Sequence, residues 1–183
     1  MISLMKRRPV FVTLVTILSV AGLFAIGMIG LSLSSRMPSN LGVRDGRLAP
    51  CPETPNCVST QADDQLHWIA PLDVPDDVDD PLGLIAEIVR SLPGATVMES
   101  GPEYLRSEFR SSLFRFCDDV EFLIETGGRR IHFRSASRVG RSDLGVNRAR
   151  MEDIRARWTD AVRRRQETGA KAANWTAPAA AWR

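Results

Sequence analysis

The segment from residue 134 to residue 150, RSASRVGRSDLGVNRAR, has the composition of an anion site. It contains five arginines and three serines but a single acid, Asp143. The planar guanidinium group of arginine pairs with carboxylate or phosphate through two parallel hydrogen bonds. If Asn147 caps a helix that follows, Arg148 and Arg150 fall in its first turn, where cations oppose the helix dipole. We therefore expect a negative partner here, which is either an upstream acid or a bound anion.

The run of Asp118, Asp119 and Glu121 is the acidic cluster that best fits catalysis. Two carboxylates in different environments can act as general acid and general base. In a strand, the same acids can instead pair with arginines of neighbouring strands, such as Arg134 or Arg106, and cross-strand charge pairs commonly stabilise sheets. Pairing, ligand binding and catalysis all stay open at this point.

The usual catalytic motifs are missing from the sequence. There is no G-x-S-x-G elbow, no Walker loop and no G-x-G-x-x-G. His67 and His132 are the only histidines, and neither lies near a nucleophile in sequence. We assign no catalytic residue and expect no metal and no cofactor. The candidate ligand-binding residues are Asp118, Asp119, Glu121, Arg134, Ser135, Ser137, Arg138, Asp143, Asn147, Arg148 and Arg150.

The cysteines indicate an oxidising compartment. Cys51 and Cys57 bracket a short proline-rich loop, CPETPNC, and such a pair outside the cytosol is typical of a disulfide. A zinc site would need two further ligands and usually has closer cysteine spacing. Cys117 stands at the head of an apolar run, and we expect it to be a buried free thiol.

The N-terminus predicts a membrane segment. Residues 9–35 are 27 uncharged and mostly apolar residues, longer than a secretory core and without a good cleavage site. We predict an uncleaved single-pass anchor over 9–35, with a cleaved signal peptide as the alternative. Lys6, Arg7 and Arg8 place residues 1–8 in the cytoplasm by the positive-inside rule. The remaining chain is then periplasmic or otherwise extracytoplasmic, and the membrane is the inner membrane.

The net charge of +2 conceals an asymmetry along the chain. Residues 37–125 carry 6 basic and 17 acidic groups, whereas residues 126–183 carry 14 basic and 5 acidic groups. The split allows an acidic part to fold against a basic part. It also argues against a nucleic-acid partner. An anionic small ligand or an envelope protein is a more suitable partner.

The hydrophobic pattern predicts one exported domain over residues 48–167, after a polar linker at 36–47. Strands are expected at 65–72 and 93–100, and three alternating strands at 104–112, 115–125 and 129–137. A helix from Pro81, capped by Asp79 or Asp80, lies between them, and a second covers 147–167. Residues 168–183 form an Ala/Pro-rich tail that we expect to be disordered. The fold class is α+β: an antiparallel sheet of four to five strands with both helices on one face.

Three motifs in this order resemble one known family. They are CPETPNCVST, FRFCDDVEFLIE and IHFRSASRVGRSDLGVNRARMEDIR, and the chain is similar to bacterial and plant proteins catalogued as domain of unknown function 1499 over residues 48–158. The resemblance implies no established activity, substrate or cofactor. The motif positions are Cys51, Pro52, Asn56, Cys57, Asp118, Asp119, Glu121, Arg134, Ser135, Ser137, Arg138, Gly140, Asp143, Gly145, Asn147 and Arg150.

Three functions fit these observations. The first is a membrane-anchored, non-catalytic envelope domain that binds a ligand or partner through the Arg/Asp/Ser cluster. The second is a hydrolase or transferase on an anionic envelope substrate, with Asp118, Asp119 or Glu121 as acid or base and Arg134 or Arg138 holding the charge. The third is a purely structural ion-pair network that fixes helix to sheet.

Overall fold

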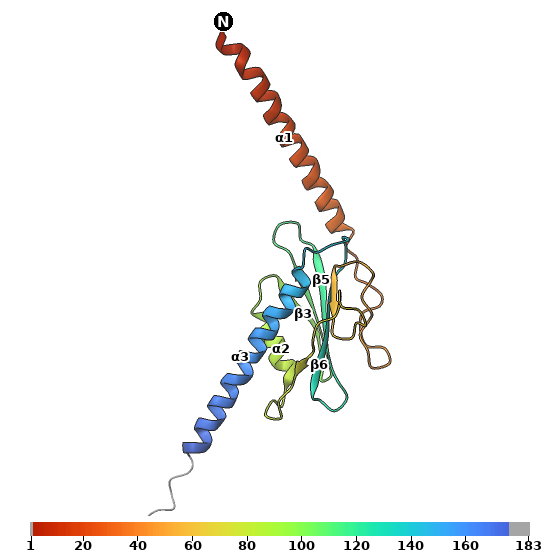
Figure 1. Ribbon diagram of the computed structural model, residues 1–183, viewed down its shortest axis with the longest axis vertical. Helices are drawn as coiled ribbons and strands as arrows, with labels where there is room; N and C mark the ends of the chain where they lie inside the picture. The colour runs from red at the N-terminus through yellow and green to blue at the C-terminus, as the bar shows by residue number, and fades with distance from the viewer. Residues whose placement is uncertain (1, 176–183) are drawn as a thin grey trace, which may run out of the picture.

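The computed structural model describes residues 2–175, and within them one helix projects from a domain of two helices and a sheet (Figure 1). In chain order the elements are α1 (Ile2–Leu33), β1 (Cys57–Ser59), β2 (Leu72–Asp73), α2 (Pro81–Arg90), β3 (Ala95–Ser100), β4 (Tyr104–Arg110), β5 (Cys117–Ile124), β6 (Arg130–Ser137) and α3 (Val146–Trp175).

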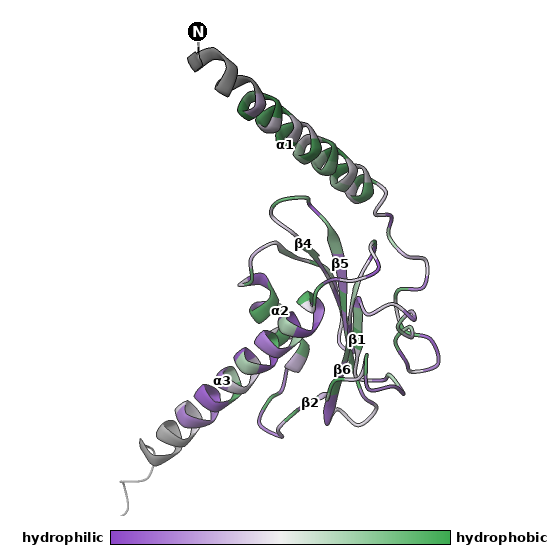
Figure 2. Ribbon diagram, turned by 45° about the horizontal axis from the view of Figure 1, so that its top comes forward, coloured by the Kyte–Doolittle hydropathy of each residue, from purple (hydrophilic) through white to green (hydrophobic). Residues whose placement is uncertain are grey.

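Figure 2 shows that the coloured part of α1 is mostly hydrophobic. Its segment Pro9–Leu33 has a mean hydropathy of 2.4, and none of it is buried against the rest of the protein. About 20 such residues cross the hydrocarbon core of a bilayer. By length and composition α1 can therefore span a membrane, and both a retained anchor and a signal sequence fit this helix.

The sheet is antiparallel throughout and has the strand order β1-β6-β5-β4-β3, with β2 paired to the other end of β6. The hairpin between β5 and β6 turns at Gly127 and Gly128, whose φ angles of +100° and +73° suit glycine. Register follows from alternation, because a slip of one residue would send the apolar side chains to the wrong face. The register sets Glu121 opposite both Arg106 and Arg134.

The core lies between the sheet and the two helices of the domain. Leu105, Phe122 and Phe133 point from the sheet into this layer and are fully buried. Ile85 of α2 and Ile154 of α3 meet them there. The structure confirms the predicted α+β class with an antiparallel sheet packed against helices, and the very short β1 and β2 bring the sheet to six strands.

The N-terminal cap was predicted correctly for α2 but not for α3. Asp80 caps α2 as expected, since its Oδ1 accepts from the N–H of Gly83 at 2.8 Å and Pro81 takes the first helical position. The predicted cap of α3 by Asn147 is wrong. Asp143 does this work, because its carboxylate accepts from the N–H groups of Gly145 at 3.0 Å and Asn147 at 2.7 Å.

Two further local predictions differ from the structure. Residues 65–67 form a turn, held by the Asp64 carboxylate accepting from the N–H of His67, whereas we expected a strand over 65–72. α3 continues to Trp175, into the segment that we expected to be a disordered tail. The alanines there favour helix, and the next proline is Pro178. Residues 176–183 of that predicted tail lie outside the described residues.

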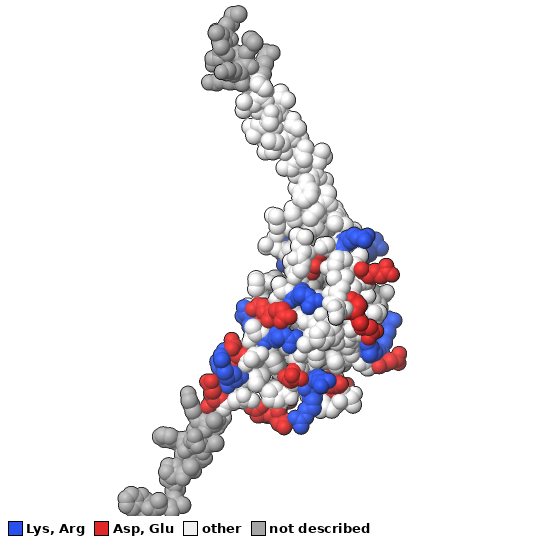
Figure 3. Space-filling model, in the orientation of Figure 1, with Lys and Arg blue, Asp and Glu red and all other residues white. Residues whose placement is uncertain are grey.

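The face of the sheet away from the helices is also covered. Residues 36–50, most of which we predicted to be a linker, run along this face (Figure 1). The backbone N–H of Gly42 donates to Oε1 of Glu121 at 2.7 Å, and Leu48 is buried. Charged strand residues that alternation directs away from the core are therefore buried as well. Acidic and basic side chains intermix over the surface that Figure 3 shows.

Candidate functional site

The sheet divides the Arg/Asp/Ser motif into two groups, one on each face. Because side chains alternate along a strand, Asp119 and Glu121 point away from the helices, whereas Asp118, one residue before Asp119, points toward α3. The structure therefore does not bring the three predicted acids together. Each acid has its own arginine.

Arg138 is the centre of the group on the covered face. Its Nε and Nη2 donate to the two carboxylate oxygens of Asp119 at 2.8 Å and 2.7 Å, and Nη2 also donates to Oε1 of Glu108 at 2.5 Å. The side chains of Arg138, Asp119 and Glu108 are 5 %, 1 % and 8 % exposed. Arg106 lies 3.6 Å from Asp119, and Arg110 lies 2.8 Å from Glu108. Arg138 thus directs its Nε and Nη2 to carboxylates inside the protein.

The pKa of Glu108 reflects this network. Burial alone would raise it, but the hydrogen bonds and charges of Arg138 and Arg110 outweigh burial and lower the pKa below its usual value. The carboxylate is therefore held in its charged form by its two arginines.

Glu121 is the second acid of the covered face, and its side chain is fully buried. It accepts from the N–H of Gly42 and from the hydroxyl of Tyr104, both at 2.7 Å, and Arg134 lies 3.4 Å away. Burial and the charge of Glu121 raise the pKa of Tyr104. Through its hydrogen bond with Gly42, Glu121 ties the covering segment to the sheet.

Asn147 organises the group on the helix side. Its amide nitrogen donates to the carbonyl of Asn56 and to Oγ of Ser137, both at 3.0 Å. Its amide oxygen accepts from Oγ of Ser135 at 2.5 Å and from Arg150 at 2.7 Å. Asn147 is 1 % exposed, so it joins α3, the end of β6 and the cysteine loop within the interior.

Arg150 completes the helix-side group. Its Nη1 also donates to Ser135 at 3.1 Å, and its Nη2 donates to Oδ2 of Asp118 at 2.5 Å. The guanidinium lies over the ring of Phe109, 4.6 Å from the centroid. Arg148 points elsewhere and donates to the carbonyls of Leu66 and Trp68, both at 3.0 Å. At the start of α3, Arg150 thus pairs with Asp118, Arg148 donates to backbone carbonyls, and the backbone N–H of Asn147 donates to Asp143.

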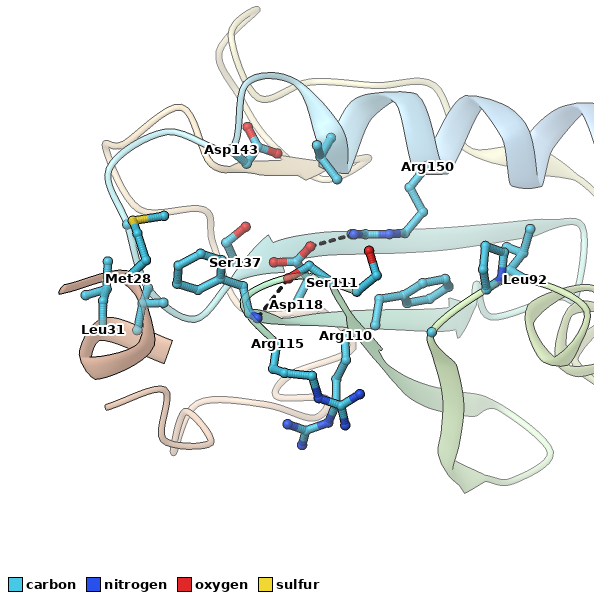
Figure 4. A pocket seen from close by; sticks show the side chains of 18 of the residues that line it. Met28, Leu31, Leu92, Arg110, Ser111, Arg115, Asp118, Ser137, Asp143 and Arg150 are labelled. Atoms are coloured by element: carbon cyan, nitrogen blue, oxygen red, sulfur yellow. Dashed lines mark hydrogen bonds and ion pairs between the residues drawn. The ribbon is translucent and has the colours of Figure 1, made fainter. Parts of the chain in front are cut away.

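A pocket of about 730 Å³ opens beside the Asp118–Arg150 pair (Figure 4). Its walls come from the end of α1, the loop after α2, the β4–β5 loop and the β6–α3 loop. Among the lining residues are Met28, Leu31, Leu92, Phe109, Phe116 and Val139, together with the motif residues Asp118, Ser137, Asp143 and Arg150. In Figure 4 the guanidinium groups of Arg110 and Arg115 point away from Asp118. The pocket therefore has a largely apolar wall and one ion pair in its floor.

The smaller sequence predictions have clear outcomes. Cys51 and Cys57 form the expected disulfide, with their Cα atoms 5.7 Å apart. Cys117 is a buried free thiol, and burial raises its pKa to about 11.

Several residues of the site were missed by reasoning from the sequence. Glu108 and Tyr104 looked like surface positions of a strand, and alternation alone cannot tell which faces a loop will cover. Phe109 is a buried member of the core and also lines the pocket, as does the half-buried Phe116. Gly42 had no signal, because its contribution is a backbone N–H.

Comparison with known proteins agrees with the motif resemblance. Residues 47–157, more than half of the chain, match the family model described as "Protein of unknown function (DUF1499)". No curated protein and no solved structure matches the chain. The paired cysteines, the acidic run and the arginine-rich run all lie within the matched residues. The chain therefore belongs to the DUF1499 family of proteins of unknown function.

Proposed function

We propose that this chain is a membrane-anchored, non-catalytic envelope domain that binds a small amphiphile in the pocket above Asp118 and Arg150. The apolar part of the ligand lies along Leu92, Phe116 and Val139, and its polar end meets Asp118. Apolar pockets with a few convergent polar groups are the usual form of small-molecule sites.

One observation carries this proposal: four side chains of the motif border this pocket. Asp118, Ser137, Asp143 and Arg150 line it. By contrast, Arg134 and Arg138 are buried and bonded to carboxylates on the other face. A ligand that contacts these motif side chains therefore enters from the side of the sheet that the helices cover.

The polar end of the ligand follows from the charge of the floor. Arg150 neutralises Asp118 through Oδ2, and among the hydrogen bonds of the described residues none involves Oδ1. An acceptor oxygen beside an apolar wall favours a hydroxyl donor over an anion. The anionic ligand that we expected from the sequence is thus less suitable for this pocket than a neutral, donor-bearing amphiphile.

The enzyme alternative has weaker support from the geometry. A hydrolase or transferase built on Asp118, Asp119 and Glu121 with Arg134 and Arg138 would need these side chains in one cavity. Asp119 and Glu121 are 1 % and 0 % exposed and lie on the face opposite Asp118. General acid–base catalysis requires a group within reach of the substrate.

The topology that goes with this proposal is the one that the charges predict. α1 crosses the inner membrane once, residues 1–8 are cytoplasmic, and the domain lies outside. The disulfide between Cys51 and Cys57 supports an oxidising compartment for the domain.

Thermal unfolding of the full chain in lipid nanodiscs tests the proposal. The probes are 1-octanol, octanoate and glycerol, which distinguish the contribution of the ligand's alkyl chain from that of its head group. We expect 1-octanol to raise the melting temperature more than octanoate does, and glycerol to have no effect. The proposal would be contradicted if octanoate raised the melting temperature more than 1-octanol did, or if neither of these two probes changed it.

A pair of matched variants shows where the probe binds. Val139→Trp places an indole in the pocket, whereas Val43→Trp changes a 41 % exposed valine that is not among the pocket-lining residues. We expect the octanol effect to disappear in Val139→Trp and to persist in Val43→Trp. An undiminished effect in Val139→Trp would place the probe elsewhere and refute the site.

A further inference from the structure

Three segments meet at the end of the domain next to α1. They are the last turns of α1, the β4–β5 loop at 111–116 and the β6–α3 loop at 139–145, which all lie at this end in Figures 1 and 2. Phe114 of the first loop packs edge-on against Phe24 of α1, with ring centroids 6.4 Å apart. Met28 and Leu31 of α1 line the same pocket as Phe116 and Val139.

The contact between Phe114 and Phe24 gives the depth of the β4–β5 loop relative to the membrane-spanning part of α1. Phe24 lies nine residues before Leu33, the last residue of α1, and this corresponds to about 13 Å along the helix axis at 1.5 Å per residue. The span Pro9–Leu33 is about five residues longer than a bilayer core requires. Even when the whole excess protrudes on the domain side, Phe24 stays inside the hydrocarbon. A loop whose Phe114 touches Phe24 therefore reaches below the membrane surface.

The tips of both loops carry large apolar side chains that contact little of the protein. Leu113 is 78 % exposed and Leu144 is 94 % exposed. Leu144 also has a φ of +55°, an uncommon conformation for a residue with a side chain. Arg115 and Arg141 are exposed in the same loops, and arginine beside an apolar anchor can hold its charged head at the interface.

We infer that the β4–β5 and β6–α3 loops insert into the membrane leaflet at the C-terminal end of α1. Leu113, Phe114 and Leu144 are the anchors, and the bilayer that holds α1 is the partner. This contact orients the domain with its pocket mouth toward the acyl layer. It goes beyond the proposed ligand site, since a membrane-docked face holds whether or not the pocket is filled, and it requires that α1 is retained.

Site-directed spin labelling of the full chain tests the inference. Nitroxides are attached after Leu113→Cys, Leu144→Cys or Leu66→Cys, in nanodiscs of phosphatidylethanolamine and phosphatidylglycerol at 3:1. Leu66 is 58 % exposed and serves as the control outside both loops. The unsubstituted chain measures background labelling of the buried Cys117. Collisions with oxygen report lipid, and collisions with a water-soluble nickel chelate report solvent.

We expect a several-fold higher ratio of oxygen to nickel accessibility at Leu113 and Leu144 than at Leu66. Equal ratios at the three positions would overturn the inference and would leave the octanol result untouched. Shielding of Leu113 from both reagents would also overturn it, because a protein partner would then cover the loop. All three sites are exposed, so the substitutions remove no core contact.

Discussion

Replacing Arg138 with alanine removes the centre of the buried network on the covered face of the sheet. Asp119 loses two hydrogen bonds and Glu108 loses one, while both carboxylates stay buried. Breaking a buried pair by removing one partner costs about 3–5 kcal/mol. Arg106 remains 3.6 Å from Asp119 and Arg110 remains 2.8 Å from Glu108, so we expect the lower end of that range. A loss of about 3 kcal/mol lowers the melting temperature of a domain of this size by roughly 10 °C.

The assay is thermal unfolding of the full chain in nanodiscs, followed by tryptophan fluorescence. Arg163→Ala is the matched control, because Arg163 is 65 % exposed and pairs with Asp160 on the surface of α3. Such a pair contributes less than about 1 kcal/mol. If Arg138→Ala unfolds within 2 °C of the unsubstituted chain, or if Arg163→Ala loses as much, the network does not hold the fold as the distances indicate.

The next three predictions use the same unfolding measurement, and a fourth uses alkylation of Cys117. Asn147→Ala should cost about 2 kcal/mol because it leaves buried partners unsatisfied, whereas Asn40→Ala, at an exposed position, should change little. The free energy of unfolding should be highest above about pH 6.5 and fall below it, because burial lowers the pKa of His132 in the folded chain and the unfolded chain therefore binds that proton first. Below about pH 4.5 it should fall further, because the pKa of Glu108 is also lowered in the folded chain and the unfolded chain again binds the proton first. A stability that rises on acidification would contradict this sign. Reduction of the Cys51–Cys57 disulfide should cost about 2 kcal/mol, and Cys117, with a pKa of about 11, should resist iodoacetamide at pH 8 until the chain unfolds.

The sheet and its two helices could be predicted because their signals are local. Alternation of Leu105 and Phe109, the glycine turn at Gly127 and Gly128, and the cap at Asp80 each act within a few residues. The pairing of acids with arginines was one of the alternatives that the sequence left open, and Glu121 does lie opposite Arg134 in the hairpin register. The family motifs include Asp119, Glu121, Arg134 and Arg138 of this pairing but not Glu108.

The unpredicted part of the site depends on contacts far apart in sequence. Gly42 bonds Glu121 across 79 residues, and Asn147 bonds Asn56 across 91 residues. No local pattern shows that residues 36–50 cover the charged face, and this covering turns surface charges into buried ones. For the same reason we expected Arg138 to bind an anionic ligand, although its observed partners are two carboxylates of the protein, Glu108 and Asp119.

Photo-crosslinking most directly tests the central claim that the accessible part of the motif is the Asp118–Arg150 pocket. A monoacylglycerol with a diazirine in its chain is added to the full chain in nanodiscs, and the modified peptides are identified by mass spectrometry. We predict adducts on the pocket segments that contain Phe109 and Val139, with loss of these adducts in Val139→Trp but not in Val43→Trp. Adducts confined to α1, or located on the covered face around Tyr104 and Arg106, would contradict the claim.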